Sequence, residues 1–154
     1  MDDVVQAYRD ADYWRARLAA FGVDSKLESL RANDDAVEVV TLQVVPDDAL
    51  PGLITQVHRG DLCIRRAETW GPVRDGVATA AIEGSIEGAP AQVSGTAKLS
   101  PTTDPDGSRL DYLLTVEVNV PLIGGKLENF IGAQLANLVA AEQLFTTAWL
   151  TDNA

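Results

Sequence analysis

The C-terminal third of the chain carries one long helical pattern, and this pattern most constrains the fold. After the turn-like segment Val120-Pro-Leu-Ile-Gly-Gly-Lys126, apolar residues recur at helical spacing to about Leu150. At about 100° per residue, five large apolar side chains fall within about 40° of one another on the helical wheel: Leu127, Ile131, Leu138, Phe145 and Trp149. A stripe of this length predicts a single long helix that buries one side against the rest of the protein.

Two polar residues are set into the apolar side of this helix. Gln134 lies about 40° from the midpoint of the stripe, and Glu142 lies about 40° from it on the opposite flank. A long apolar helix with polar groups on its buried side is typical of a cavity wall. The stripe, together with Tyr112 from the preceding strand, would form the apolar wall, and Gln134 and Glu142 would orient a bound molecule.

Glu142 and Gln134 each have two interpretations. In a dry cavity, desolvation would raise the pKa of Glu142 and make its carboxyl an acid, a base or a ligand-orienting group. Alternatively, the Glu142 side chain reaches the cavity rim or pairs with an arginine such as Arg65 or Arg66. Gln134 would either orient a polar group of the ligand or be a core amide whose hydrogen bonds are satisfied inside the protein.

The residues before this helix predict two short helices followed by strands. Helical patterns cover 2–9 and 12–21, with Asp10 or Asp12 as the cap of the second helix. A short helix is predicted at 49–58, between the second and third strands. The chain 1–154 has no linker or internal repeat, so we expect one domain. Period-two patterns bounded by turn residues predict six strands, at 24–32, 37–45, 61–70, 76–86, 91–100 and 108–120.

The alternation in the last strand predicts an antiparallel sheet with one solvated face. From Leu110 to Val120 every second residue is apolar or aromatic, and the residues between them are mostly polar. The strands at 76–86 and 91–100 instead turn small residues inward, including Ala78, Ala80, Gly84, Gly95 and Ala97. Either the long helix approaches the sheet closely there, or these residues curve the sheet, or the space is left open for a ligand.

The order of these elements resembles the helix-grip fold of the START-like (SRPBCC) superfamily, which includes the birch-pollen allergen, polyketide cyclases and lipid-transfer domains. The resemblance implies an α+β fold in which a curved antiparallel sheet grips the long C-terminal helix, with an apolar cavity between them. Three segments also look like an uncharacterised actinobacterial family assigned to that superfamily as a domain of unknown function, and none of them marks a reaction: Asp10-Ala-Asp-Tyr-Trp-Arg-Ala-Arg-Leu18, Glu68-Thr-Trp70 and Pro121-Leu-Ile-Gly-Gly-Lys-Leu-Glu128.

The sequence departs from this resemblance at its start. The superfamily normally opens with a strand before the first helix, whereas Met1 leads almost directly into a helical pattern here. Without that first strand the sheet would have unpaired edges, which promote aggregation. We therefore expect a version of the chain extended upstream to be more stable or more soluble.

Charge and residue counts argue against several classes of protein. A net charge of −11 argues against nucleic-acid binding, which needs clustered lysines and arginines, and disfavours anionic membranes. Cys63 is interpreted as a small buried side chain, and His58, the single histidine, cannot build a histidine-rich metal site. We expect no metal and no cofactor. The sequence shows no signal peptide and no membrane-spanning run, so we expect a cytoplasmic location.

The outer side of the long helix is small and uncharged. An exposed helical face usually includes lysines and glutamates, so a neutral face predicts contact with a second subunit in a homodimer. The residues of this face are Asn129, Ala133, Ala136, Asn137, Ala140, Gln143 and Thr147.

These features together predict a binding protein for an apolar small molecule, either lipid-like or aromatic, with no evident catalysis. One alternative is a cyclase- or dehydratase-like enzyme of the same fold that uses Glu142 as general base. Another is a protein-interaction module whose interior is filled by side chains. A cavity of roughly a few hundred cubic ångströms would separate the first two functions from the third.

Overall fold

The chain begins with two short helices that pack against each other. The computed structural model describes residues 1–49, 52–55 and 59–154. Helix α1 spans Asp2–Tyr8 and helix α2 spans Ala11–Phe21. The side chain of Asp10 accepts a 2.9 Å hydrogen bond from the backbone N–H of Asp12, so Asp10 is the N-cap that begins α2.

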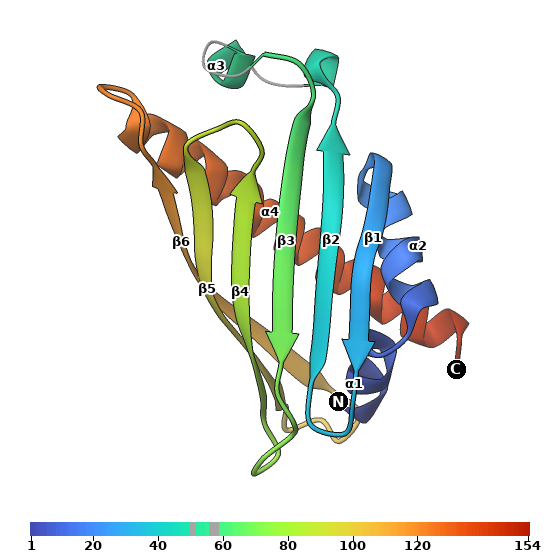
Figure 1. Ribbon diagram of the computed structural model, residues 1–154. Helices are drawn as coiled ribbons and strands as arrows, with labels where there is room; N and C mark the ends of the chain where they lie inside the picture. Colours follow the sequence, from blue (N-terminus) through green and yellow to red (C-terminus); the bar gives the residue numbers. More distant parts are fainter. Residues whose placement is uncertain (50–51, 56–58) are drawn as a thin grey trace.

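Six antiparallel strands follow the two helices and pair in chain order. The period-two patterns predicted these antiparallel strands, and the resemblance to the helix-grip fold implied the curvature of the sheet (Figure 1). The predicted strands are confirmed, with small shifts at their ends. The fourth strand begins two residues later than predicted, and the sixth ends two residues earlier. The strands are β1 (Val23–Ala32), β2 (Val37–Val45), β3 (Leu62–Trp70), β4 (Ala78–Ile86), β5 (Ala91–Pro101) and β6 (Ser108–Val118).

The connection between β2 and β3 contains short helical segments. A 3₁₀ turn, η1, covers Asp47–Ala49, and helix α3 covers Gly52–Thr55. The continuous helix predicted at 49–58 falls partly outside the described residues, as does His58.

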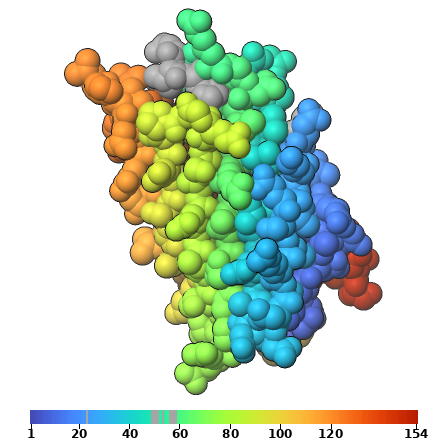
Figure 2. Space-filling view, in the orientation of Figure 1, coloured from blue at the N-terminus to red at the C-terminus, as the bar shows by residue number. Residues whose placement is uncertain are grey.

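The long C-terminal helix α4 spans Gly124–Asp152 and runs diagonally across one face of the sheet (Figure 1). In the space-filling view the outer face of the sheet hides most of this helix, and parts of α4 are visible only at the margins of the sheet (Figure 2). The structure therefore has the predicted α+β architecture, with two short N-terminal helices, a curved sheet and a long helix on its inner side.

Gly95 allows the close approach of β5 and β6 that curves the sheet. Gly95 pairs with Leu114, and a Cβ atom added at Gly95 would lie 1.9 Å from the backbone oxygen of Leu113. Gly84 differs, because its added Cβ would make only ordinary contacts, the nearest 3.5 Å from Val93 Cβ. The close approach of β5 and β6 therefore requires a glycine at position 95. Gly84 has no such requirement, and the absence of its side chain leaves space on the inner face of the sheet.

Aromatic side chains fill one half of the space under the sheet. Tyr8, Tyr13 and Trp14 come from α1 and α2, and Tyr13 and Trp14 are almost completely buried. They belong to one core cluster with the small strand residues Ala78, Ala80 and Ala97 and with Trp70. These small residues therefore make room for aromatic rings of the N-terminal helices, an arrangement that the sequence patterns did not suggest.

A candidate ligand cavity between the sheet and helix α4

The other half of the space under the sheet is hollow. It contains two adjoining chambers, a wide chamber of about 460 Å³ and a narrow chamber of about 120 Å³. The chambers share side chains from β2, β3, β4, β5 and α4, so they form one tapering cavity. The shared lining residues are Gln43, Ile64, Ile86, Ala91, Ile131, Leu135 and Leu138.

The wide chamber lies at the end of the sheet near α3 and the turn between β4 and β5 (Figure 1). Leu127 and Phe130 of α4 form one wall, and Ile54 of α3 contributes to another. Among its described lining residues only Gln43 and Gln134 are polar, and no side chain is charged. This chamber therefore suits the apolar part of a molecule.

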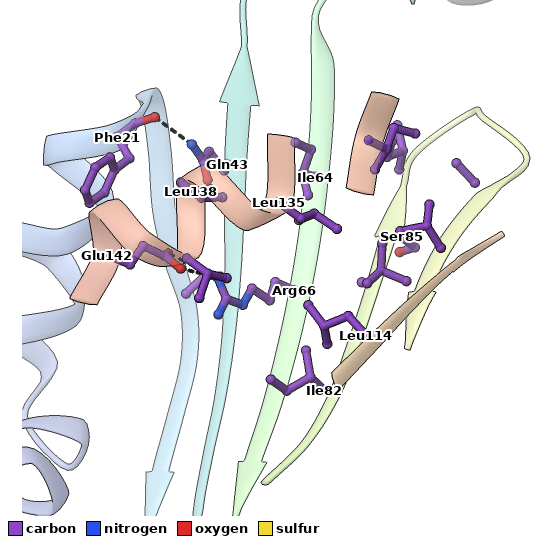
Figure 3. A pocket seen from close by; sticks show the side chains of 18 of the residues that line it. Phe21, Gln43, Ile64, Arg66, Ile82, Ser85, Leu114, Leu135, Leu138 and Glu142 are labelled. Atoms are coloured by element: carbon purple, nitrogen blue, oxygen red, sulfur yellow. Dashed lines mark hydrogen bonds and ion pairs between the residues drawn. The ribbon is translucent and has the colours of Figure 1, made fainter. Parts of the chain in front are cut away.

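The narrow chamber continues beneath the middle of β2 and β3 and ends at charged side chains. Thr41, Gln43 and Arg66 line it from the sheet, and Glu142 lines it from α4. Figure 3 shows Arg66 and Glu142 pointing toward each other at one side of this chamber. The narrow chamber is thus the polar end of a mostly apolar cavity.

Four charged residues from three elements form a buried charge cluster at this polar end: Arg17 of α2, Arg66 and Glu68 of β3, and Glu142 of α4. The Nε of Arg17 donates a 2.9 Å hydrogen bond to Glu142 Oε2, and Nη1 of Arg66 lies 2.9 Å from Glu142 Oε1. Nη2 of Arg66 also lies 2.6 Å from Glu68 Oε1. Two positive and two negative charges sum to zero, so the buried charge cluster is neutral.

The arginines keep Glu142 ionised. Burial raises the pKa of the Glu142 carboxyl, but the charges and hydrogen bonds of Arg66 and Arg17 outweigh burial and bring this pKa below its ordinary value of 4.5. The raised pKa expected for a dry cavity is therefore wrong, because two cations accompany the carboxylate. The alternative of pairing with an arginine is correct for Arg66, whereas Arg65 binds Glu28 at 2.7 Å.

Further contacts hold the buried charge cluster in place. Nε1 of Trp70 donates a 3.0 Å hydrogen bond to Glu68 Oε2, and the guanidinium of Arg17 lies 4.8 Å from the Trp14 ring centre. Thr146 Oγ1 lies 2.7 Å from the Tyr13 hydroxyl, one turn of α4 beyond Glu142. These contacts tie the N-terminal helices to β3 and α4 beside the cavity.

The predicted site residues divide into two groups. Five of them line the cavity: Leu127, Ile131, Gln134, Leu138 and Glu142. Gln134 is exposed, so it lies on the wide chamber as a solvent-accessible amide.

The remaining three predicted residues lie elsewhere. Phe145 and Trp149 pack on Tyr13, with ring centres 6.1 and 5.9 Å from its ring. Tyr112 lines a neighbouring groove between β6 and α4, which shares Leu114, Val116, Leu135 and Val139 with the narrow chamber. The helical stripe therefore continues beyond the cavity into the aromatic core.

Five polar residues of the cavity were not singled out from the sequence as site residues: Arg17, Thr41, Gln43, Ser85 and Gln92. Arg66 was considered only as a partner of Glu142. The sequence of β3 does contain an indication of a polar site. Side chains at alternate positions from Leu62 to Trp70 face inward, and Arg66 and Glu68 occupy two of these positions. Charged residues at inward strand positions predict a polar site, although they do not identify what they contact.

Within 1–49, 52–55 and 59–154, no three His, Cys, Asp or Glu side chains are grouped so that they could hold a metal ion. No helix in these ranges is both long enough and apolar enough to cross a membrane. Cys63 is a half-buried free thiol of β3.

Residues 1–150 match the protein family described as "Protein of unknown function (DUF2505)". The chain is also 54% identical, over an alignment 159 positions long, to an uncharacterised protein of Mycobacterium tuberculosis and to one of Mycobacterium bovis. Each alignment covers 99% of this chain and 91% of the relative. Because these relatives are themselves uncharacterised, a function has to be argued from the geometry of the cavity.

Proposed function

This chain belongs to the DUF2505 family of proteins of unknown function, and we propose that it binds an apolar small molecule, lipid-like or aromatic, in the cavity between the sheet and α4. The observation that carries the proposal is the wide chamber of about 460 Å³. Protein interiors are close-packed and leave few voids, and binding pockets typically have volumes of about 300–1,000 Å³. This chamber is partly open to solvent, so its apolar lining together with its volume, and not its volume alone, favours a bound molecule over a filled core.

The fold supports the same proposal. We propose that the chain belongs to the START-like superfamily, and the order of its elements supports this, because two short helices and a curved antiparallel sheet precede one long helix. The apolar wall would consist of Leu127, Ile131 and Leu138, with Gln134 at the solvent-accessible part of the wide chamber.

The enzymatic alternative gains no support from the contacts of Glu142. A general base must be free to accept a proton, and its pKa is best matched to the working pH. The Glu142 carboxylate instead accepts hydrogen bonds from Arg17 and Arg66, which lower its basicity. Its role in the proposal is to hold the arginines and the helix in position.

Native mass spectrometry of the purified protein, which detects a co-purified ligand, tests the proposal most directly. A titration with the neutral fluorophore N-phenylnaphthylamine gives a second readout. We expect saturable binding with one fluorophore per chain and an emission spectrum typical of an apolar environment. Absence of both a co-purified molecule and fluorophore binding would contradict the proposal.

A matched pair of variants on α4 locates the binding. Leu138 lines both chambers, so Leu138→Trp should fill the cavity and abolish fluorophore binding. Leu144 lies on the same helix but is 74% exposed, so Leu144→Trp should bind like the wild type. Thermal unfolding establishes whether both variants fold. If Leu138→Trp does not fold, Ile131→Phe provides a smaller substitution that also fills part of the cavity. Equal binding by both tryptophan variants would place the fluorophore outside the cavity.

A further inference from the structure

We propose that the molecule bound in this cavity is a neutral amphiphile, whose hydroxyl or carbonyl group lies in the narrow chamber beside Thr41, Gln43 and Arg66 while its apolar body fills the wide chamber. This inference rests on the proposed binding function and specifies the chemical class of ligand. It follows from the placement of the polar groups, from their unused hydrogen-bonding capacity and from the charge balance around them.

The polar groups gather at one place because of the register between β2 and β3. Thr41 is directly opposite Arg66 in the antiparallel pair, and Gln43 is opposite Ile64. Residues two apart on a strand share a face, so Thr41 and Gln43 both face the cavity on the side where Arg66 lies. A ligand group in the narrow chamber would meet all three side chains.

Each of these side chains has hydrogen-bonding capacity that the protein does not use. Among the described residues the Thr41 hydroxyl has no hydrogen-bond partner, although Thr41 is only 8% exposed. Gln43 donates through Nε2 to the Phe21 carbonyl at 2.6 Å, which leaves its Oε1 as an acceptor (Figure 3). Among the described residues, Glu68 Oε1 is the buried side-chain atom that lacks a hydrogen-bond partner, so the Thr41 hydroxyl and Gln43 Oε1 are not sealed in but open to the chamber. A ligand hydroxyl or carbonyl in the chamber would form hydrogen bonds with them.

Arg66 also has N–H donors that the described part of the protein does not use. Its Nη1 donates to both oxygens of Glu142, at 2.9 and 3.0 Å, and its Nη2 contacts Glu68. No hydrogen bond within the described part of the chain involves its Nε. The available groups are therefore an arginine N–H donor, a hydroxyl and an amide oxygen, which together suit a hydroxyl or a carbonyl.

The charge balance explains why the ligand group is neutral. The buried charge cluster already pairs two arginines with two glutamates, so it offers no unmatched cation to a carboxylate and no unmatched anion to an ammonium. The wide chamber has no charged side chain among its described lining residues. A charged head group would lose its hydration without gaining an opposite charge, and this loss strongly disfavours binding.

Three molecules with the same alkyl body and different head groups test this inference: decanol, decanoate and decylammonium. Each competes with N-phenylnaphthylamine at pH 8, where decanoate and decylammonium are charged. We expect decanol to displace the fluorophore at a concentration at least tenfold lower than either charged molecule. Displacement by decanoate or decylammonium at the same concentration as decanol would overturn the inference that the head group is neutral. Absence of both fluorophore binding and a co-purified molecule would overturn the proposed function instead.

A substitution in the narrow chamber provides the second test. Thr41→Val removes the hydroxyl and keeps the branched shape, so we expect the affinity for decanol to fall about threefold to tenfold, the loss of one hydrogen bond. The affinity for the fluorophore should stay unchanged. Thr79→Val is the matched control, because Thr79 lies on the exposed face of β4. Unchanged decanol affinity in Thr41→Val would contradict the placement of the head group.

Discussion

Glu142 Oε1 on α4 lies 2.9 Å from Nη1 of Arg66 on β3, across the interior between the helix and the sheet. The other carboxylate oxygen of Glu142 accepts a hydrogen bond from Arg17 on α2. One side chain thus connects three elements beside the narrow chamber. The distance between α4 and the sheet at this point is set by an ion pair, and the space next to it stays open.

Replacing Glu142 should destabilise the fold. Glu142→Gln leaves two buried guanidinium groups with one carboxylate between them, and breaking a buried pair costs about 3–5 kcal/mol in the free energy of unfolding. Glu28→Gln is the control, because Glu28 pairs with the half-exposed Arg65 and an exposed pair contributes about 1 kcal/mol or less. Urea unfolding of both variants measures the difference, and equal losses would show that the buried charge cluster has no special role.

The stability of the protein should fall in acid partly through Glu142. Its pKa in the folded protein lies below the ordinary value of 4.5, so the folded state binds this proton less tightly than the unfolded chain. The stabilisation is fully present above about pH 4.5 and is lost as the pH falls through the folded-state pKa. Below pH 4.5 the free energy of unfolding should therefore decline more steeply in the wild type than in Glu142→Gln. Parallel curves for the two proteins would refute this assignment.

The two inner-face glycines of β4 and β5 should respond differently to alanine. Gly95→Ala places a Cβ against the Leu113 carbonyl, so we expect a loss of about 1–3 kcal/mol in the free energy of unfolding, or a failure to fold. Gly84→Ala meets only ordinary contacts, so the free energy of unfolding should change by less than about 1 kcal/mol. Thermal unfolding of the pair checks the expectation. A well-folded Gly95→Ala variant would show that β5 and β6 have room to move apart.

The uncharged outer face of α4 still predicts a homodimer. Ala133, Ala136, Asn137 and Ala140 are exposed, and Leu144 beside them is 74% exposed. Gln143 does not belong to this face, because its Nε2 donates a 3.2 Å hydrogen bond to the Leu110 carbonyl. Sedimentation at tens of micromolar should show a dimer for the wild type and a monomer for Ala136→Glu. A wild-type monomer under these conditions would exclude this interface.

Much of the fold was predictable because secondary structure follows local periodicity. The alternation between Leu110 and Val120 predicted strand β6 and which of its side chains face inward. The long apolar stripe predicted helix α4. Residues close together in the chain determine both patterns, so a single sequence is enough to detect them.

The cavity was only partly predictable, because a helical wheel projects all residues onto one plane. Leu127 and Trp149 lie at similar angles, yet 22 positions along a helix separate them by about 33 Å. Leu127 borders the wide chamber, whereas Trp149 lies where Tyr13 of α2 covers the helix. The angle predicts which side of α4 is buried, and the elements that cover that side decide whether a residue meets a ligand or a core ring.

The sequence alone therefore determined the order of the elements, the side that each turns inward and the presence of Glu142 on the buried side of α4. The tertiary structure decided the partners and the charge state of Glu142, since Arg66 and Arg17 are 76 and 125 positions away along the chain. It also decided which half of the interior is hollow, because α1 and α2 place their aromatic rings under only one end of the sheet. Volume and ion pairing depend on segments distant in the chain, and local patterns carry no information about which distant segments meet.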